Sequence, residues 1–379
     1  MKPPVWISKI APRVAKPGPL QGLTFAIKDN IDYAGVPTTA GCPAYAYTPH
    51  ESATVVHDLE EAGAVALGKT NLDQFATGLV GVRSPYGSCS SIFDPEYISG
   101  GSSSGSAVAV ASGQVDFSLG TDTAGSGRVP AAFNNIIGLK PSRGLLSLKG
   151  VVPACFSLDC VSIFARDLLT ARRVLDAVSD PAEEDPQPWA ASHFLFGIPR
   201  PSQLEFFGDK EAKSLFYESV VRLQNAGGKA VEIDYAPFLE AAQLLYSGPW
   251  VAERYAAVGE FIESHPDAVH PVVRDIILKG KQYSATDAFR GMYRLAELKA
   301  IAEREWEKMH VMLLPTTGTT YKIADVEKNP LQLNTNLGYY TNFVNLLDLA
   351  ALAIPAGFRR NGLPFGVTLI GKSRSDRAL

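Results

Sequence analysis

Two short stretches of the sequence are crowded with serine and glycine, residue types that supply hydroxyl nucleophiles and tight turns. The first is SGGSSSGSAVAVASG at residues 99–113, and the second is GTDTAGSG at residues 120–127. A flexible linker would continue as a polar tract, whereas the first stretch turns at once into small apolar residues, which favours a short buried helix ending near Gly113. A phosphate-binding loop would need the lysine and hydroxyl that end a P-loop, and the stretch lacks them. For the first stretch, part of a catalytic centre with a serine hydroxyl is therefore favoured over a linker or a phosphate-binding loop.

A serine hydroxyl becomes a strong nucleophile only when a neighbouring base takes its proton. Histidine is the familiar base, but none of the six histidines lies in a glycine- or serine-rich turn, and the GxSxG elbow of an α/β-hydrolase is missing. A lysine can serve instead when burial lowers its pKa enough to leave it neutral near pH 7. Lys28 follows the apolar stretch LTFAI and precedes DNID, so its side chain could enter a partly buried polar site. By itself this position is more typical of a solvated surface lysine at a strand end.

Composition excludes several classes of protein. The hydrophobic fraction of 46% and charged fraction of 20% are typical of a soluble globular chain. The net charge of −4, without a basic stripe, argues against a nucleic-acid partner. We find no run of 18 apolar residues and no signal peptide, so we expect no membrane partner and a cytoplasmic protein. The four cysteines form no CxxC pair, which favours reduced thiols over disulfides or a metal site.

Helix and strand patterns alternate along the first half of the chain. A strand is predicted at 23–27, a helix at 53–62 and a strand at 64–69. After the second serine stretch we expect a short helix with Pro130 in its first turn, and then a loop at Gly138. This alternation indicates α/β architecture.

The second half is predicted to be mainly helical before it returns to strands. A proline- and acid-rich loop at 180–189 is expected to mark a subdomain boundary. Residues 285–309 form the longest run with helical periodicity. The chain closes with two apolar stretches joined by RRNG at 359–362, a pattern that predicts two strands and a turn.

Three segments together resemble the amidase signature family, in its order and at its separations. They are AIKDN at 26–30, GGSSSGSA at 100–107 and GTDTAGSGRVPAA at 120–132, and the resemblance extends from about residue 20 to 371. It implies an α/β amidase signature fold, with a central mixed β-sheet flanked by helices on both faces. The implied domains are an N-terminal arm at 1–20 and the amidase signature domain at 21–379, with a mainly helical substrate-binding portion at about 209–310.

The resemblance also implies a catalytic apparatus that needs no metal and no cofactor. Ser102 and Ser126 are 24 residues apart, as are the two catalytic serines of that family. Lys28 would be the base, Ser102 the bridging serine in a cis peptide, and Ser126 the nucleophile. The implied oxyanion hole consists of backbone N–H groups of Thr123, Ala124, Gly125 and Ser126. We expect Asp122 to brace this turn, and Arg128 to pair with a nearby carboxylate.

Within the family the chain is most similar to the amidase domain of the allophanate hydrolases. The similar stretches are NLDQFATGLVGVRSPYG and GVVPACFSLDCVSIFA, and Ser104 and Ala124 stand where other members carry glycine. This similarity implies deamination of allophanate (urea-1-carboxylate) in urea degradation and nitrogen metabolism. Tyr246 and Arg254, which are eight residues apart around a helix-breaking Gly-Pro, would hold the substrate carboxylate, and Gly78 would be a further contact.

Alternative functions remain open at this point. The chain could hydrolyse another small acidic or urea-like amide, such as biuret or malonamate. It could also be a non-catalytic or amidotransferase-type subunit. The expected partners are a small-molecule substrate and a second copy of the chain in a homodimer. The second, C-terminal domain of allophanate hydrolases is expected to be absent.

Overall fold

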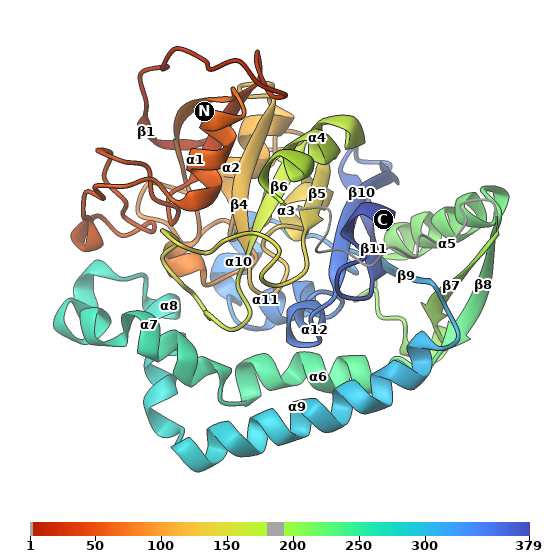
Figure 1. Cartoon of the computed structure of the whole chain (residues 1–379). Helices are drawn as coiled ribbons and strands as arrows, with labels where there is room; N and C mark the ends of the chain where they lie inside the picture. The colour runs from red at the N-terminus through yellow and green to blue at the C-terminus, as the bar shows by residue number, and fades with distance from the viewer. Residues whose placement is uncertain (1–2, 180–192) are drawn as a thin grey trace.

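One mixed β-sheet organises the molecule (Figure 1), which is described from a computed structural model covering residues 3–179 and 193–379. The described residues contribute 11 strands, in the spatial order β1-β3-β2-β4-β6-β5-β10-β11-β9-β7-β8. The strands are β1 (Trp6–Lys9), β2 (Thr24–Lys28), β3 (Val65–Thr70), β4 (Phe117–Asp122), β5 (Ile137–Lys140), β6 (Cys160–Ala165), β7 (Phe194–Pro199), β8 (Gly228–Ile233), β9 (Val311–Pro315), β10 (Ala350–Phe358) and β11 (Pro364–Gly371). β2 runs parallel to its neighbours β3 and β4, whereas β4 pairs antiparallel with β6. The predicted α/β class with a central mixed sheet is confirmed.

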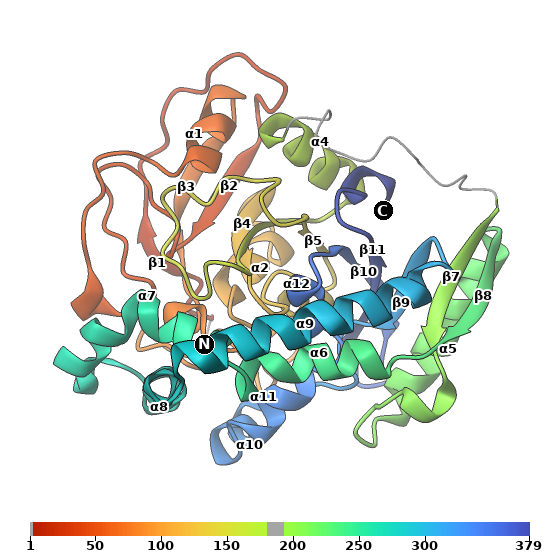
Figure 2. The same cartoon turned by 60° about the horizontal axis from the view of Figure 1, so that its bottom comes forward.

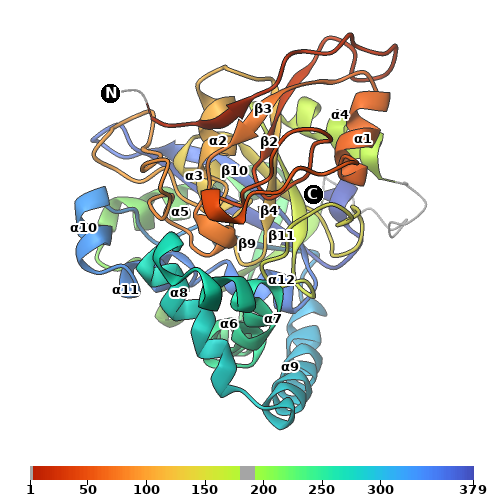
Figure 3. The same ribbon diagram turned by 90° about the vertical axis from the view of Figure 1, so that its left-hand side faces the viewer.

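Helices cover both faces of the sheet, as predicted. They are α1 (Thr54–Glu61), α2 (Ser104–Ala111), α3 (Val129–Phe133), α4 (Leu168–Val178), α5 (Lys210–Asn225), α6 (Ala236–Ser247), α7 (Trp250–Ser264), α8 (Pro271–Leu278), α9 (Ala285–Trp306), α10 (Ile323–Lys328), α11 (Gln332–Leu337) and α12 (Asn342–Leu346). Figures 1 and 2 show α6 and α9 running side by side at one end of the molecule, and Figure 3 shows α7 and α8 beside them. No helix of the described residues is long and apolar enough to cross a membrane.

The alternation of side chains along β2 decides where its last residue lies. Phe25 and Ile27 pack into a core cluster with α1 and α4 on one face of the sheet. Ala26 packs into a different cluster, with α2 and α3 on the other face. Because successive side chains of a strand point to opposite faces, Lys28 shares the α2 face with Ala26. The strand therefore directs the lysine towards the first serine-rich stretch.

Most of the predicted elements are present, and one prediction is wrong. The helix at α3 begins with Val129 and Pro130, as expected. The loop predicted at Gly138 is instead the strand β5. The glycine is needed there for close packing, because an added Cβ would lie 2.3 Å from the Gly127 carbonyl oxygen and 2.5 Å from the Ala131 Cβ.

In two other stretches the prediction was incomplete, and a third stretch cannot be compared with the structure. Within the expected arm, Trp6–Lys9 forms β1, which pairs antiparallel with β3 at the edge of the sheet. The mainly helical portion at 209–310 also contains β8. The loop predicted at 180–189 lies outside the described residues.

We predict that Gly138→Ala destabilises the fold by about 1–3 kcal/mol. The added methyl would meet a backbone carbonyl and a helix Cβ, neither of which can move as freely as the end of a flexible side chain. Urea unfolding followed by circular dichroism measures the change. An unfolding midpoint equal to that of the original chain would show that β5 and α3 are less tightly packed than the structure indicates.

Candidate active site

Lys28 ends β2 in a fully buried position among hydroxyl groups. Its Nζ donates a hydrogen bond to the Ser102 Oγ at 2.8 Å and another to the Thr121 Oγ1 at 2.8 Å. The Thr121 carbonyl oxygen lies further away, at 3.4 Å. Thr121 belongs to β4, the parallel neighbour of β2, and was not anticipated from the sequence. The structure thus brings the predicted base and bridging serine into direct contact.

Burial lowers the pKa of Lys28 to about 7, because the charged ammonium is poorly solvated in the interior. Three buried carboxylates act in the opposite direction, those of Asp73, Asp159 and Asp122. None of them lies within ion-pair distance of Lys28, whereas Lys69 on β3 is 3.2 Å from an Asp29 carboxylate oxygen. Lys28 can therefore exchange a proton near neutral pH.

Ser102 lies in the turn that precedes α2, directly after a cis Gly101–Ser102 peptide bond. Its carbonyl oxygen accepts a hydrogen bond from the Asp73 N–H at 3.1 Å. An added Cβ at Gly101 would come within 2.1 Å of an Asp73 carboxylate oxygen, so glycine is required where these two segments meet. The next residue, Ser103, donates from its Oγ to the Thr121 carbonyl oxygen at 3.1 Å and so ties the turn to β4.

A buried ion pair braces the second turn, as expected for Asp122 and Arg128. The guanidinium donates from Nε to one Asp122 oxygen at 2.9 Å and from Nη2 to the other at 3.0 Å. Burial alone raises the pKa of Asp122, but the Arg128 charge and its hydrogen bonds outweigh burial, and the pKa is lowered. The same carboxylate accepts the Gly125 N–H at 2.8 Å and the Gly127 N–H at 2.9 Å. Asp122 thereby fixes the backbone on both sides of Ser126, through the N–H groups of Gly125 and Gly127.

The backbone N–H groups of this turn are not equivalent. The Gly125 N–H is already used by Asp122. Among the described residues, no hydrogen-bond acceptor is found for the N–H groups of Thr123, Ala124 and Ser126. These three groups are therefore without an acceptor in the described part of the chain, whereas the fourth N–H group predicted for the oxyanion hole is bound to Asp122.

Ser126 is 2% exposed. It follows Thr123 and Ala124, whose N–H groups have no acceptor among the described residues, and it precedes Arg128 of the ion pair. Within the described part of the chain, no hydrogen bond joins its hydroxyl to that of Ser102. The lysine–serine link is thus formed in this structure, and the serine–serine link is not. Such links are often long in proteins without substrate and shorten when the substrate binds.

Arg254 is a buried arginine without a carboxylate partner. It lies on α7 and is 2% exposed, and its Nη1 donates to the Thr77 Oγ1 at 3.1 Å. Its Nε has no hydrogen-bond partner, and no ion pair of the described residues includes it. The guanidinium carbon lies 5.6 Å from the Tyr246 ring centre. A buried cation without an anion is costly, so this site fits an anionic ligand.

The expected break between Tyr246 and Arg254 is confirmed. α6 ends at Ser247 and α7 begins at Trp250, on either side of Gly248-Pro249. Both helices approach the second turn, because Ala124 shares a core cluster with Trp250, and Tyr246 packs against that cluster. The break thus lets two helices contribute to one site.

Gly78 lies beside Thr77, the residue that binds Arg254, and has a φ of +154°. An added Cβ there would be 2.6 Å from an Asp73 oxygen and 3.2 Å from the Arg83 Nη1. Arg83 is itself buried, and its Nη1 donates to the Thr77 carbonyl oxygen at 3.1 Å. Sequence reasoning missed Arg83 and Asp73, although both lie in the stretch 71–87 that carried the resemblance.

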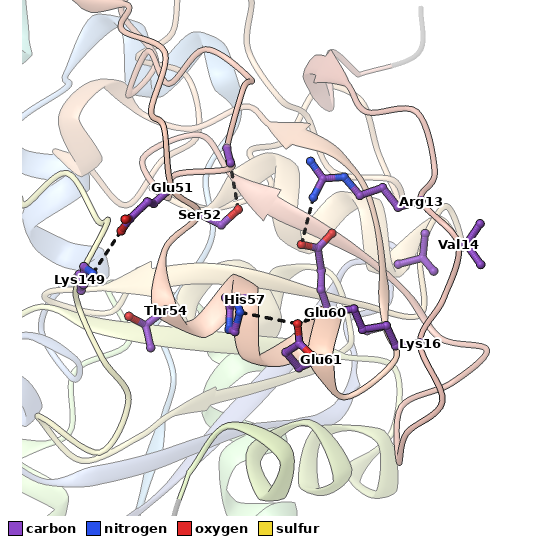
Figure 4. A pocket seen from close by; sticks show the side chains of 13 residues that line it. Arg13, Val14, Lys16, Glu51, Ser52, Thr54, His57, Glu60, Glu61 and Lys149 are labelled. Atoms are coloured by element: carbon purple, nitrogen blue, oxygen red, sulfur yellow. Dashed lines mark hydrogen bonds and ion pairs between the residues drawn. The ribbon is translucent and has the colours of Figure 1, made fainter.

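A pocket of about 520 Å³ beside α1 is a separate feature (Figure 4), and no residue proposed for catalysis lines it. Its charged side chains face one another in pairs. Arg13 is 3.6 Å from Glu60, His57 is 3.6 Å from Glu61, and Lys149 is 3.3 Å from Glu51. The pocket therefore lacks the unpaired charge that marks the Arg254 site. Among the described residues, no group of histidine, cysteine and carboxylate side chains could hold a metal ion.

The chain is similar to several known proteins over almost its whole length. Urea amidolyase of Saccharomyces cerevisiae is 48% identical over 373 residues, which are 95% of this chain and 20% of that protein. A glutamyl-tRNA(Gln) amidotransferase subunit of Heliobacterium modesticaldum is 36% identical, with 96% of this chain and 82% of that protein covered. A solved structure of Kluyveromyces lactis allophanate hydrolase is 45% identical, with a TM-score of 0.95, and covers 100% of this chain and 66% of that one.

The chain therefore spans about a fifth of the yeast urea amidolyase that it matches. The amidase family matches at residues 7–379, which is almost the whole sequence. This chain belongs to the amidase family.

Proposed function

We propose that this chain hydrolyses allophanate to N-carboxycarbamate and ammonia. The observation that carries the proposal is Arg254, a buried guanidinium without an anionic partner close to a turn with free N–H groups. Allophanate offers a carboxylate at one end and a primary amide at the other, which matches a cationic site beside an oxyanion site. The similarity to the Kluyveromyces lactis allophanate hydrolase structure supports the same reaction.

In the proposed first step, neutral Lys28 accepts a proton from Ser102 while Ser102 accepts one from Ser126. The Ser126 Oγ forms a bond to the amide carbon, and the carbonyl π electrons move onto the oxygen. The free N–H groups of the turn would stabilise that oxyanion, each fixed donor contributing about 3 kcal/mol.

Collapse of the tetrahedral intermediate breaks the bond between carbon and nitrogen. The proton held on Lys28 returns through Ser102 to the leaving nitrogen, and ammonia departs. Water then attacks the acyl-enzyme with the same relay as its base, which releases the product and restores the Ser126 hydroxyl. The sequence of steps uses the proton transfers that Lys28, with a pKa near 7, can make in both directions.

The carboxylate end of the substrate would be held by Arg254, with Tyr246 and Gly78 as further contacts. The planar guanidinium can donate two parallel hydrogen bonds to a carboxylate. A substrate this small offers few other groups to bind, so the ionic contact would supply much of the specificity.

We further propose that the reaction belongs to urea degradation and nitrogen metabolism in the cytoplasm. All four cysteines are buried and unpaired, which suits a reducing compartment. A homodimer stays a prediction. Glutamine belongs among the amides to be tested, because the relatives include amidotransferase subunits.

We predict that Ser126→Ala lowers kcat for ammonia release from allophanate by about 10⁴-fold or more, because the nucleophile is lost. Ser102→Ala should lose a similar factor, since the two serines act in one relay. Ser112→Ala, at the end of α2, is the matched control and should keep full activity. The assay measures ammonia from allophanate, biuret, malonamate and glutamine. Undiminished activity of Ser126→Ala would disprove the mechanism.

We predict that kcat/KM for allophanate rises with pH through about 7 and then levels off. The base must be neutral, and the pKa of Lys28 is lowered to about 7, so protonation removes activity on the acid side. Ammonia release measured from about pH 6 to about pH 8 tests this sign. Lys28→Arg keeps a permanent charge and should be inactive across the range. A flat profile would exclude Lys28 as the base.

We predict that Arg254→Gln lowers kcat/KM for allophanate about 100-fold, because the substrate carboxylate would be left without a counter-charge. Biuret has a neutral amide in place of the carboxylate, so its kcat/KM should change far less. Arg172→Gln, on the exposed side of α4, is the matched control. Equal losses on both substrates would show that Arg254 holds the fold rather than the carboxylate.

A further inference from the structure

Asp159 is a buried carboxylate that the proposed relay does not use. It directly precedes β6 and is 4% exposed. One oxygen accepts a hydrogen bond from the Thr123 hydroxyl, and the other accepts the N–H groups of Ala154 at 2.8 Å and Cys155 at 3.1 Å. No lysine or arginine of the described residues lies within ion-pair distance of it. Among the described residues, its only side-chain hydrogen-bond partner is therefore Thr123, in the turn that carries Ser126.

The loop 154–159, which carries Asp159, is attached at its other side to α7. Glu253 of that helix accepts the Ser157 N–H at 2.7 Å and the Ser157 hydroxyl at 2.7 Å. It also accepts the Cys155 thiol at 2.9 Å. Glu253 is the residue before Arg254. One short loop thus contacts both the turn around Ser126 and the helix that carries the unpaired guanidinium.

A third contact fixes the distance between the loop and the turn. The Asn345 side-chain amide of α12 donates to the Asp122 carbonyl oxygen at 2.7 Å and to the Leu158 carbonyl oxygen at 3.0 Å. These carbonyls belong to the residues directly before Thr123 and Asp159. Asn345 thus holds the backbone before Thr123 and the backbone before Asp159 at a fixed separation. The hydrogen bond between the Thr123 and Asp159 side chains is made across this separation.

We infer that Asp159 is a positioning residue, which through Thr123 fixes the free N–H groups of the turn and, through loop 154–159, sets them at a constant distance from Arg254. This inference rests on the proposed function. A substrate held at both ends needs the oxyanion donors and the carboxylate partner at matching positions. A shift of about 1 Å in such a constellation can lower a rate about 100-fold.

Asp159 also influences the base electrostatically. The charged groups that act on Lys28 are the carboxylates of Asp73, Asp159 and Asp122, all of which raise its pKa against the effect of burial. Asp122 forms an ion pair with Arg128, whereas among the described residues Asp159 has no lysine or arginine at ion-pair distance, and only the more distant Arg254 charge acts to lower its pKa against the effect of burial. Removal of the Asp159 charge should therefore lower the pKa of Lys28 further.

The first test removes only the hydroxyl that reaches Asp159. Thr123→Val keeps the shape of the side chain and the backbone N–H, and should lower kcat for allophanate about 100-fold with little change in KM. Thr123→Ser keeps the hydroxyl and should recover most of the kcat that Thr123→Val loses, while Ser112→Ala, at the end of α2, is the control outside the site with unchanged kcat. If Thr123→Val keeps full kcat, or Thr123→Ser loses as much as Thr123→Val, the inference is overturned.

The second test uses a readout that a purely structural role would not move. In Asp159→Asn the acid limb of the pH profile of kcat/KM should shift to lower pH, in addition to a loss of kcat. An unshifted limb in a folded Asp159→Asn protein would overturn the electrostatic role, and if this variant does not fold, the Thr123 pair decides. Failure of the proposed function is seen separately, because Ser126→Ala would then leave ammonia release unchanged from that of the original chain.

Discussion

The buried amine of Lys28 is the constraint around which the centre of this molecule is built. An ammonium group without a partner carboxylate is poorly tolerated in the interior, and here burial lowers its pKa to about 7. Three surrounding carboxylates keep the pKa from falling further, and two hydroxyls accept hydrogen bonds from Nζ. Near neutral pH the surroundings of Lys28 therefore favour neither the charged nor the neutral form of its amine. A buried lysine in this position makes the fold less stable than an apolar side chain would. The packing of the rest of the sheet must offset this loss of stability.

The rigidity of the neighbouring turn follows from a different use of charge. Asp122 and Arg128 are both buried, yet they neutralise each other and satisfy two backbone N–H groups of the turn. A buried ion pair adds little net stability, but the loss of one member leaves an uncompensated charge. The pair therefore specifies a single turn conformation. It also explains why one of the four N–H groups expected in the oxyanion hole is occupied, since Asp122 accepts the Gly125 N–H from the same short segment.

Features that depend on local pattern could be predicted from the sequence, and those that depend on packing between distant segments could not. The strand that leads to Lys28 and the helix break at Gly248-Pro249 follow from spacing and residue type. A brace at Asp122 and a carboxylate partner for Arg128 were expected separately, and the structure shows that the two residues pair with each other. The strand β5 was not predicted because Gly138 is required for close packing against the Gly127 carbonyl, and this contact forms only on folding. Asp159 was missed for a similar reason, because no pattern near it in the sequence predicts its contact with Thr123, which lies 36 residues earlier.

The fold separates the parts that would perform the reaction from the parts that would choose the substrate. Lys28 lies at the end of β2, Ser102 on the turn before α2 and Ser126 on the turn after β4, and both strands lie inside the sheet rather than at its edge. Arg254 lies on α7, outside the sheet, and reaches the centre through Thr77. Because these residues come from separate segments of the chain, substitutions in the helical part could change the substrate without changing the proposed relay. Such an arrangement is consistent with the similarity of this chain to relatives with different names, a urea amidolyase and an amidotransferase subunit, since function resides in sites placed on a fold rather than in the fold itself.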